Sequence, residues 1–239
     1  MKRKLKNLIK GLLKVLPIRF SRNQRYDAQT LEVMRRVLHK DSNAVDVGGH
    51  DGDILKEMIR FAPNGTHYCF EPIPVFAHKL RSKFPNAKVF EMALADAKGE
   101  TTFQYVKSNP AYSGLKKRQY TGEERIEEIK VKIEKLDDII PEKTPVHLIK
   151  IDVEGGELGV LKGAHRIIEQ WKPVVIFEHG KGASEFYKTT PEDVFNFFDH
   201  SGMKISLLEN FIQGGKALSK TDFIEQYEKE INYYFIAHS

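Results

Sequence analysis

The sequence predicts an α/β fold, an open and mainly parallel β-sheet with helices on both faces. Two observations support this prediction. Short apolar runs typical of strands alternate with amphipathic helical segments along most of the chain. Polar residues gather just after these strands, where sheets of this class bind their ligands. With 239 residues the chain is long enough to bury a full core without disulfides.

A basic segment precedes this alternation. Residues 1–26 contain nine lysines or arginines and no acid, which leaves 29 bases and 33 acids in the rest of the chain. The net charge of +5 therefore resides in the N-terminal segment, and this split disfavours a uniformly basic nucleic-acid-binding protein. We expect a basic amphipathic helical arm over residues 1–40 and one globular domain over residues 41–239.

The arm has the pattern of a surface helix. Leucine and isoleucine recur at helical spacing from Leu5 to Leu16 with lysines on the opposite face, and Pro17 ends the pattern. Such a helix attaches to an anionic membrane surface or, more commonly, packs on its own domain or a partner subunit. Residues 1–20 are therefore a candidate for peripheral membrane contact or self-association.

Other features bear on location. The lysines of the arm interrupt any signal peptide, and no run reaches the ~18 apolar residues of a membrane span. The single cysteine, Cys69, fits a reducing compartment. We expect a cytoplasmic protein, peripheral at most to the inner face of the membrane.

The first half of the chain predicts a helix and then three strand–helix units. Pro74 suits the first turn of its helix. The predicted strands are residues 44–47, 66–70 and 88–92, and the predicted helices are residues 27–40, a segment from Ile54 to Ile59, and residues 74–84.

The second half adds two strands with period-two alternation, residues 100–106 and 128–133. The polar stretch 107–127 between them is long for a plain connection, and we expect a mobile or substrate-facing loop. Tyr112, Ser113 and the Lys116-Lys117-Arg118 cluster would then shape substrate choice, and the alternative for the cluster is an ordinary solvated charge run. The remaining strands are residues 146–151, 174–177, 204–208 and 232–237, with one helix from Leu158 to Ile168 and another after Thr190.

The polar residues at the strand ends suggest a nucleoside site. Gly48 and Gly52, after the first strand, let the backbone approach a ligand closely. Glu71 ends the second strand, and a carboxylate there can accept hydrogen bonds from both ribose hydroxyls of an adenosine. The cofactor would then be NAD or S-adenosylmethionine. The glycine spacing differs from Gly-x-Gly-x-x-Gly, which argues against a dinucleotide.

Several strings in the sequence share one family pattern. They are Val45-Asp-Val-Gly-Gly-His-Asp-Gly52, Phe70-Glu-Pro72, Ala93-Leu-Ala-Asp96, Lys135-Leu-Asp-Asp-Ile139 and Leu148-Ile-Lys-Ile-Asp-Val-Glu-Gly-Gly-Glu-Leu158. On these strings the chain resembles the FkbM-type family of S-adenosylmethionine-dependent methyltransferases over residues 43–180, with a looser tail to 239. The resemblance implies a class I Rossmann-like methyltransferase fold, with a mostly parallel seven-stranded sheet, helices on both faces and extra strands.

The resemblance also implies roles for single residues. Gly48, Gly49 and His50 would border the methionine part of S-adenosylmethionine, Glu71 would hold the ribose, and Asp152 would face the methionine amino group or the transfer site. The full predicted cofactor set is Asp46, Gly48, Gly49, His50, Gly52, Glu71, Pro72, Met92, Ala93, Leu94 and Asp152, with the residues from Met92 to Leu94 beside the adenine. The family usually has Gly-Ala-Asn-x-Gly, and His50 replaces its asparagine here.

The acceptor is expected to be a hydroxyl. Methyltransferases acting on planar nitrogen use Asn/Asp-Pro-Pro-Tyr/Phe after the fourth strand, and this chain has Asp152-Val-Glu-Gly155 there. The resemblance suggests a small metabolite or a sugar unit as acceptor. A hydroxyl needs a base, and Asp152, Glu154, His179 and His50 are candidates for it.

The predicted catalytic set is Lys150, Asp152, Glu154 and His179. Lys150 lies two residues before Asp152 on a strand, so the two side chains share a face and can pair. Two plainer interpretations stay open: Glu154 as an acid complementing a helix N-terminus, and His179 as an exposed turn residue.

Further alternatives also stay open. Asp152, Glu178 and His179 could bind a divalent metal, although no ligand spacing requires one. Nucleic acid is disfavoured as a partner. Two other functions are a nucleic-acid methyltransferase that grips phosphates with its arm, and a membrane-docked binding module without enzymatic activity.

Overall fold

The computed structural model describes residues 21–118 and 123–239. The expected helix from Leu5 to Leu16 lies outside the described residues, and so do the membrane and self-association hypotheses for residues 1–20. Within the described residues, no helix combines the length and the apolar character that crossing a bilayer requires.

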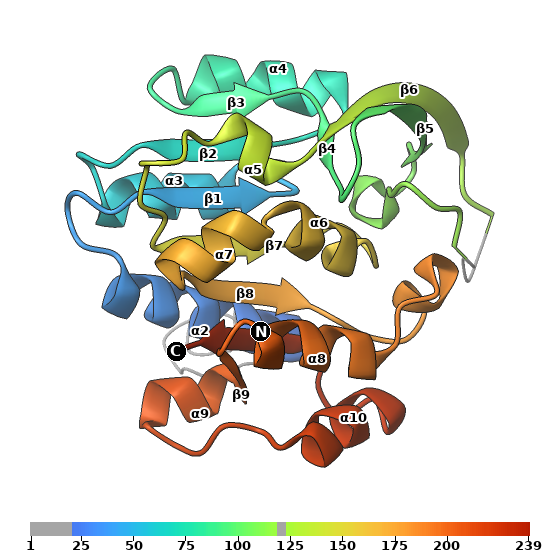
Figure 1. Cartoon of the computed structure of the whole chain (residues 1–239). Helices are drawn as coiled ribbons and strands as arrows, with labels where there is room; N and C mark the ends of the chain where they lie inside the picture. The colour runs from blue at the N-terminus through green and yellow to red at the C-terminus, as the bar shows by residue number, and fades with distance from the viewer. Residues whose placement is uncertain (1–20, 119–122) are drawn as a thin grey trace, which may run out of the picture.

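The predicted α/β fold is confirmed (Figure 1). A seven-stranded sheet has the order β3-β2-β1-β7-β8-β10-β9. The neighbours from β3 to β8 pair in parallel, and β10 pairs antiparallel with both β8 and β9. The strands are β1 (Ala44–Val47), β2 (His67–Phe70), β3 (Lys88–Phe90), β7 (Leu148–Ile151), β8 (Val174–Glu178), β9 (Lys204–Leu207) and β10 (Tyr234–His238).

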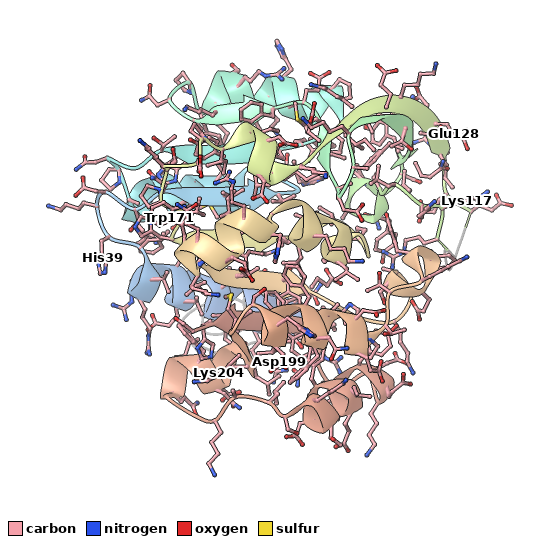
Figure 2. All side chains as sticks on the ribbon, in the orientation of Figure 1. His39, Lys117, Glu128, Trp171, Asp199 and Lys204 are labelled. Carbon is pink, nitrogen blue, oxygen red and sulfur yellow. The ribbon has the colours of Figure 1, made fainter. Side chains whose placement is uncertain are left out.

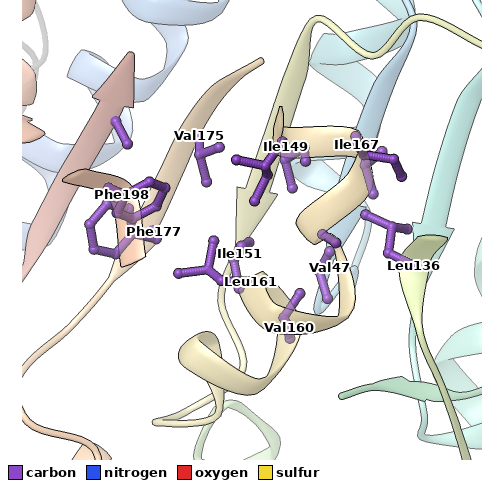
Figure 3. Close-up of a cluster of buried hydrophobic side chains, with 14 of the residues drawn as sticks. Val47, Leu136, Ile149, Ile151, Val160, Leu161, Ile167, Val175, Phe177 and Phe198 are labelled. Carbon is purple, nitrogen blue, oxygen red and sulfur yellow. The ribbon is translucent and has the colours of Figure 1, made fainter. Parts of the chain in front are cut away.

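Side chains alternate between the two faces of this sheet, and each face packs on its own helices. Val47, Ile149 and Ile151 contact Val160, Leu161 and Ile167 in the main core (Figure 3). The helices of that face are α5 (Leu136–Ile139), α6 (Glu157–Gly163), α7 (His165–Trp171), α8 (Pro191–His200) and α10 (Lys220–Glu228).

The opposite face carries Ala44, Leu148 and Ile176, which pack on Val33, Met34 and Met58. Its helices are α2 (Arg22–Val37), α3 (Asp53–Phe61), α4 (Pro74–Lys83) and α9 (Leu208–Gln213). On this face Asp46 and Lys150 are paired neighbours on β1 and β7, so the apolar rows give way to polar residues towards the carboxyl ends.

The extra strands form a separate small sheet in the order β4-β6-β5, from β4 (Ala93–Leu94), β5 (Gly99–Val106) and β6 (Ile126–Glu134). It projects on the side towards which β1 points (Figure 1). Ala93, Phe103 and Val131 of this sheet are buried together with Ile73, which lies between β2 and α4. The small sheet therefore walls the region beyond the carboxyl ends of β1 and β2.

The single helix expected from Leu158 to Ile168 is wrong, because α6 and α7 are separate helices that meet at Ala164. The Asp137 carboxylate accepts hydrogen bonds from the backbone N–H groups of Arg166 and Ile167, at 2.8 and 3.1 Å. A side chain distant in sequence thus satisfies the N-terminus of α7, which no local cap residue signals.

Helix α2 is part of the same packed unit as the sheet, so packing does not change at the expected boundary near residue 40. Val33 and Met34 are fully buried. The helix is also fastened to the other end of the chain, since Tyr26 Oη donates to Asn232 Oδ1 at 2.8 Å and the Tyr26 ring stacks on Tyr234 at 5.1 Å. The first and last described elements therefore lie side by side.

Truncating Tyr26 should measure this attachment. We expect Tyr26→Ala to lower the free energy of unfolding by about 3 kcal/mol, because a buried ring leaves a cavity and Asn232 loses its partner. Urea denaturation checks this, with the exposed Leu31→Ala on the same helix as the control, at about 0.5 kcal/mol or less. Equal losses in the two variants would contradict the attachment.

Candidate functional site

A cavity of about 520 Å³ lies at the carboxyl ends of β1, β7 and β8. One part is mostly apolar, with Ile73, Ala93, Leu94 and Phe103 in its wall. The other part is acidic and aromatic, and its wall includes Tyr26, Asp27, Asp152, Glu154, Glu178 and Tyr234. The cavity thus lies where the sequence predicted a ligand site, at the polar residues that follow the strands.

The glycine turn borders the cavity at Gly48. This residue has φ +91°, and a Cβ there would lie 2.0 Å from the carbonyl oxygen of Asp152. Gly49 and Gly52 do not line the cavity: an added Cβ would meet Cys69 and Leu80 at Gly49, and Leu80 at Gly52. They allow the helices to approach the sheet closely, whereas Gly48 forms the cavity floor.

His50 has its backbone N–H aimed at Glu71, with a distance of 2.8 Å to Oε2. Its ring packs on Phe76 at 4.4 Å. The backbone has φ +41°, a conformation in which asparagine and histidine are both enriched. Histidine can therefore adopt the positive φ that this position requires, as the asparagine of the family does.

Glu71 lies in the cavity wall and is almost fully buried. Its second oxygen, Oε1, accepts from the backbone N–H of Ile73 at 2.9 Å, so two backbone donors fix the carboxylate. Burial raises the pKa of Glu71 to about 7 in spite of these donors. The carboxylate is held in place and keeps unused lone pairs for a ligand.

The other predicted cofactor residues divide into two groups. Pro72, Ala93 and Leu94 line the cavity. Met92 is partly buried against the main core, and Asp46 is buried with no hydrogen-bond partner on Oδ2 among the described residues. Burial raises the pKa of Asp46 to about 7.

The predicted pair of Lys150 and Asp152 is confirmed. Lys150 Nζ lies 2.8 Å from Asp152 Oδ2, and the Lys150 side chain is only 4% exposed. Tyr234 joins them, because its hydroxyl donates to the same oxygen at 2.5 Å and accepts from Lys150 at 3.0 Å. Burial acts to raise the pKa of Asp152, but Lys150 and Tyr234 hold it below its usual value.

Glu154 also faces the cavity, where its carboxylate contacts Arg118 from the loop after β5. Burial and the charge of Asp152 raise the pKa of Glu154 to about 8 against the effect of Arg118. Glu157, not Glu154, braces the start of α6: its Oε1 accepts from the N–H groups of Gly155 and Val153.

His179 does not reach the cavity. Its ring is buried and stacks on Tyr227 at 4.9 Å, and burial lowers the pKa of the ring to about 4. The interpretation as an exposed turn residue is therefore wrong, and the ring is also separated from Asp152. Glu178, one residue earlier, points to the opposite side and lines the cavity.

The metal hypothesis changes accordingly. Among the described residues, Asp152, Glu154 and Glu178 have carboxylate oxygens within 4.8 Å of one another, so Glu154 replaces His179 in the group that could hold an ion. Two of the three acids already contact a cation, Lys150 or Arg118. Lys150 and Arg118 therefore offset the charges of Asp152 and Glu154, and Glu178 has no such contact among the described residues.

Part of the predicted loop contributes as expected. Tyr112, Ser113 and Arg118 line the cavity. Lys116 is exposed, and the Lys117 side chain extends away from the molecule (Figure 2). Only the arginine of the basic cluster therefore faces the site.

Sequence reasoning missed the wall formed by α2, by β10 and by the residue before β10. The residues that line the cavity there are Asn23, Tyr26, Asp27, Tyr233 and Tyr234. These residues carry no motif. The only signal was the predicted strand over residues 232–237. Strand geometry puts Tyr234 on the same face as Ile236 but does not say what lies opposite it.

Comparison with known proteins identifies the family. Residues 46–206, more than half of the chain, match the Methyltransferase FkbM domain. The chain belongs to the FkbM methyltransferase family. The FkbM motifs fall at the cavity: the Gly48 turn, Glu71 and the Asp152–Glu154 segment all lie in its wall.

This FkbM protein is similar to one curated protein and to two solved structures, among others. Methyltransferase sdnD of Sordaria araneosa is 26% identical over 171 residues, 54% of this chain and 66% of its own. Methyltransferase FkbM from Methylobacillus flagellatus KT superimposes with a TM-score of 0.52 at 17% identity, covering 84% of this chain and 44% of that chain. A TehB-like SAM-dependent methyltransferase from Corynebacterium glutamicum superimposes with a TM-score of 0.45 at 10% identity. This match covers 99% of this chain and 93% of that chain. The chain thus spans less than two thirds of the length of Methyltransferase sdnD and of Methyltransferase FkbM from Methylobacillus flagellatus KT.

S-adenosylmethionine is the cofactor of this family, and the cavity fits it. Glu71 offers its carboxylate in the cavity wall, and Gly48 lets the Asp152 backbone come close to the turn that borders the cavity. The apolar part around Ile73, Ala93 and Phe103 suits a purine ring. Cofactor contacts of single residues remain predictions from this geometry.

Cofactor affinity should depend on pH through Glu71. Ribose hydroxyls donate to the ionised carboxylate, which predominates above its pKa of about 7 and is lost below it. We expect S-adenosylhomocysteine binding to weaken about 10-fold from pH 8 to pH 6, measured by titration calorimetry. Glu71→Gln, which cannot ionise, should show a flatter profile; an unchanged slope would assign the dependence to another acid.

Proposed function

We propose that this protein transfers the methyl group of S-adenosylmethionine to a hydroxyl oxygen of a small metabolite or a sugar unit. The observation that carries the proposal is the single cavity that joins the Gly48–Glu71 region to the carboxylates around Asp152. One half of the cavity suits the nucleoside, and the other half has the acids that a hydroxyl acceptor needs.

The cofactor supplies an electrophilic methyl group when bound. The residues of the chain then have three tasks: Glu71 and Gly48 fix the nucleoside, Asp152 faces the transfer site, and nearby acids remove the acceptor proton. Lys150 and Tyr234 keep Asp152 ionised and in one orientation.

The wall chemistry favours an uncharged or cationic acceptor over a phosphate chain. Among the described lining residues are five acids, namely Asp27, Glu71, Asp152, Glu154 and Glu178, whereas Arg118 is already paired with Glu154. Because the pKa values of Glu71, Glu154 and Glu178 are raised, the repulsion of a polyanion from this cavity grows as pH rises. This argues for a small acceptor over the alternative of a nucleic-acid substrate.

The arm hypotheses remain proposals of their own. If residues 1–20 bind an anionic membrane, the enzyme would act at the inner face of the membrane; if they pair with a second copy, it would act as an oligomer. Liposome flotation and sedimentation of the full chain, each compared with a variant lacking residues 1–20, separate the two.

Two measurements test the function. Thermal shifts with S-adenosylmethionine, S-adenosylhomocysteine and NAD should show stabilisation by the first two only, because a ligand of the native state raises stability. A panel of sugars, phenols, amines and an RNA, incubated with methyl-labelled cofactor, should label a hydroxyl compound. Labelling of RNA, or of amines alone, would overturn the proposal.

A further inference from the structure

Glu178 occupies a defined position beside the transfer site. It is the last residue of β8, and the antiparallel register places it directly opposite Tyr234 on β10. Residues directly opposite in such a ladder project to the same face with Cβ atoms about 5 Å apart. Both side chains line the cavity. A carboxylate oxygen of Glu178 lies within 4.8 Å of oxygens of Asp152 and Glu154.

The three acids of this cluster have different partners. Asp152 Oδ2 is held by Lys150 at 2.8 Å and Tyr234 at 2.5 Å, and Glu154 contacts Arg118. In the part of the chain that the structure describes, no lysine, arginine or histidine pairs with Glu178. Glu178 is therefore the one acid of the three whose proton affinity is not reduced by a contacting cation.

The pKa shifts of Glu178 and Asp152 also distinguish Glu178 as the acid with the higher proton affinity. Burial, reinforced by the charges of Asp152 and Glu154, raises the pKa of Glu178 well above its usual value, whereas the pKa of Asp152 is lowered. A base with higher proton affinity takes a hydroxyl proton more effectively, provided it is ionised when the acceptor arrives. A positively charged ligand in the same cavity favours that ionised form.

We propose that Glu178 is the catalytic base that removes the proton of the acceptor hydroxyl. This inference rests on the proposed function. As the acceptor oxygen forms its bond to the methyl carbon, the carbon–sulfur bond breaks and its electron pair stays on sulfur. The hydroxyl proton passes to a Glu178 carboxylate oxygen. Tyr234 and Lys150 are positioning residues, since they hold Asp152 beside the base.

Several titratable groups face Glu178 and enter any pH profile. One ammonium and three acids belong to β7 and the segment that runs from it into α6. Tyrosines and one acid belong to α2 and to the start of β10 with the residue before it. The loop after β5 contributes one guanidinium. They are Lys150, Asp152, Glu154, Glu157, Tyr233, Tyr234, Tyr26, Asp27 and Arg118.

The kinetic test uses Glu178→Gln in the full chain, with the exposed Glu209→Gln on α9 as control. We expect kcat to fall about 10²- to 10⁴-fold with the acceptor KM nearly unchanged, and the rise of kcat with pH to disappear. Glu178→Asp should keep the rise of kcat with pH, at a lower kcat than the parent. If Glu178→Gln does not fold, this variant tests the proposal instead. A kcat within 3-fold of the parent, or a retained pH rise in Glu178→Gln, would overturn the proposal.

A binding measurement separates this proposal from the proposed function, because it needs no acceptor. Calorimetry in two buffers of different ionisation heat gives the protons released on binding. S-adenosylmethionine carries the sulfonium charge that S-adenosylhomocysteine lacks, so we expect the parent and Glu209→Gln to release more protons with the former. Glu178→Gln should lose most of that difference, with Glu154 supplying the rest, while binding S-adenosylhomocysteine within about 2-fold of the parent. A fully retained difference, or lost binding, would overturn the role of Glu178 even if a hydroxyl acceptor is found.

Discussion

Lys150→Met is expected to lower the free energy of unfolding by about 3 kcal/mol, because it leaves the buried Asp46 and the partly exposed Asp152 without their cation. Lys150 is 3% exposed and lies between Asp46, its neighbour on β1, and Asp152. Methionine keeps the volume of the side chain but removes the charge and the hydrogen bonds that the ammonium donates to Asp152 and Tyr234. Urea denaturation at pH 8 measures the loss.

The pH dependence of that loss identifies its cause. In the parent, Lys150 keeps the pKa of Asp152 low, so the ion pair stabilises the fold above the usual aspartate range and is lost as pH falls. Without the ammonium, burial raises the pKa of Asp152, and the variant becomes more stable as pH falls. The deficit should therefore shrink between pH 8 and pH 5.

Two controls isolate the pair. The exposed Lys229→Met should cost about 0.5 kcal/mol or less, since its partner Glu225 lies in solvent. The double variant Lys150→Met/Asp152→Asn should recover part of the stability, because the uncompensated charge is gone. A loss equal to that of Lys229→Met would mean that the buried ammonium does not hold the acids together.

Glu71→Ala should weaken S-adenosylhomocysteine binding about 100-fold or more. The carboxylate loses its hydrogen bonds to the ligand, each worth about 1.5–3 kcal/mol when one partner is charged, and the turn at His50 and Ile73 loses its acceptor. Glu71→Gln keeps one acceptor oxygen and should lose only about 10-fold. Calorimetric titration at pH 8 measures both.

The matched control is Glu91→Ala. This glutamate also follows a strand, β3, but it is exposed and pairs with Arg81 outside the cavity. The Glu91→Ala variant should bind S-adenosylhomocysteine with the same affinity as the parent. If Glu71→Ala binds as tightly as Glu91→Ala, the nucleoside lies elsewhere and the cofactor half of the site is misplaced.

The sequence predicted the central strands well because each is an apolar run that ends at a polar residue. Glu71 and Asp152 were found in this way, and both line the cavity. The pairing of Lys150 with Asp152 followed from spacing alone, since residues two apart on a strand share a face.

Features that depend on contacts between distant segments could not be predicted. His179 and Glu178 are adjacent at a strand end, and only the packing of Tyr227 shows which of them is buried away from the site. The break at Ala164 depends on Asp137, which lies in another helix. Tyr234 gained its place from an antiparallel register that no local pattern specifies.

The contact between α2 and β10 has a practical consequence for redesign. Both elements lie outside residues 46–206, the part that defines the family, yet they supply one wall of the cavity. A combinatorial library can therefore diversify this wall while the segment predicted to hold the nucleoside stays constant. Because the rings of Tyr26 and Tyr234 stack on each other, the two ends of the gene must be randomised together.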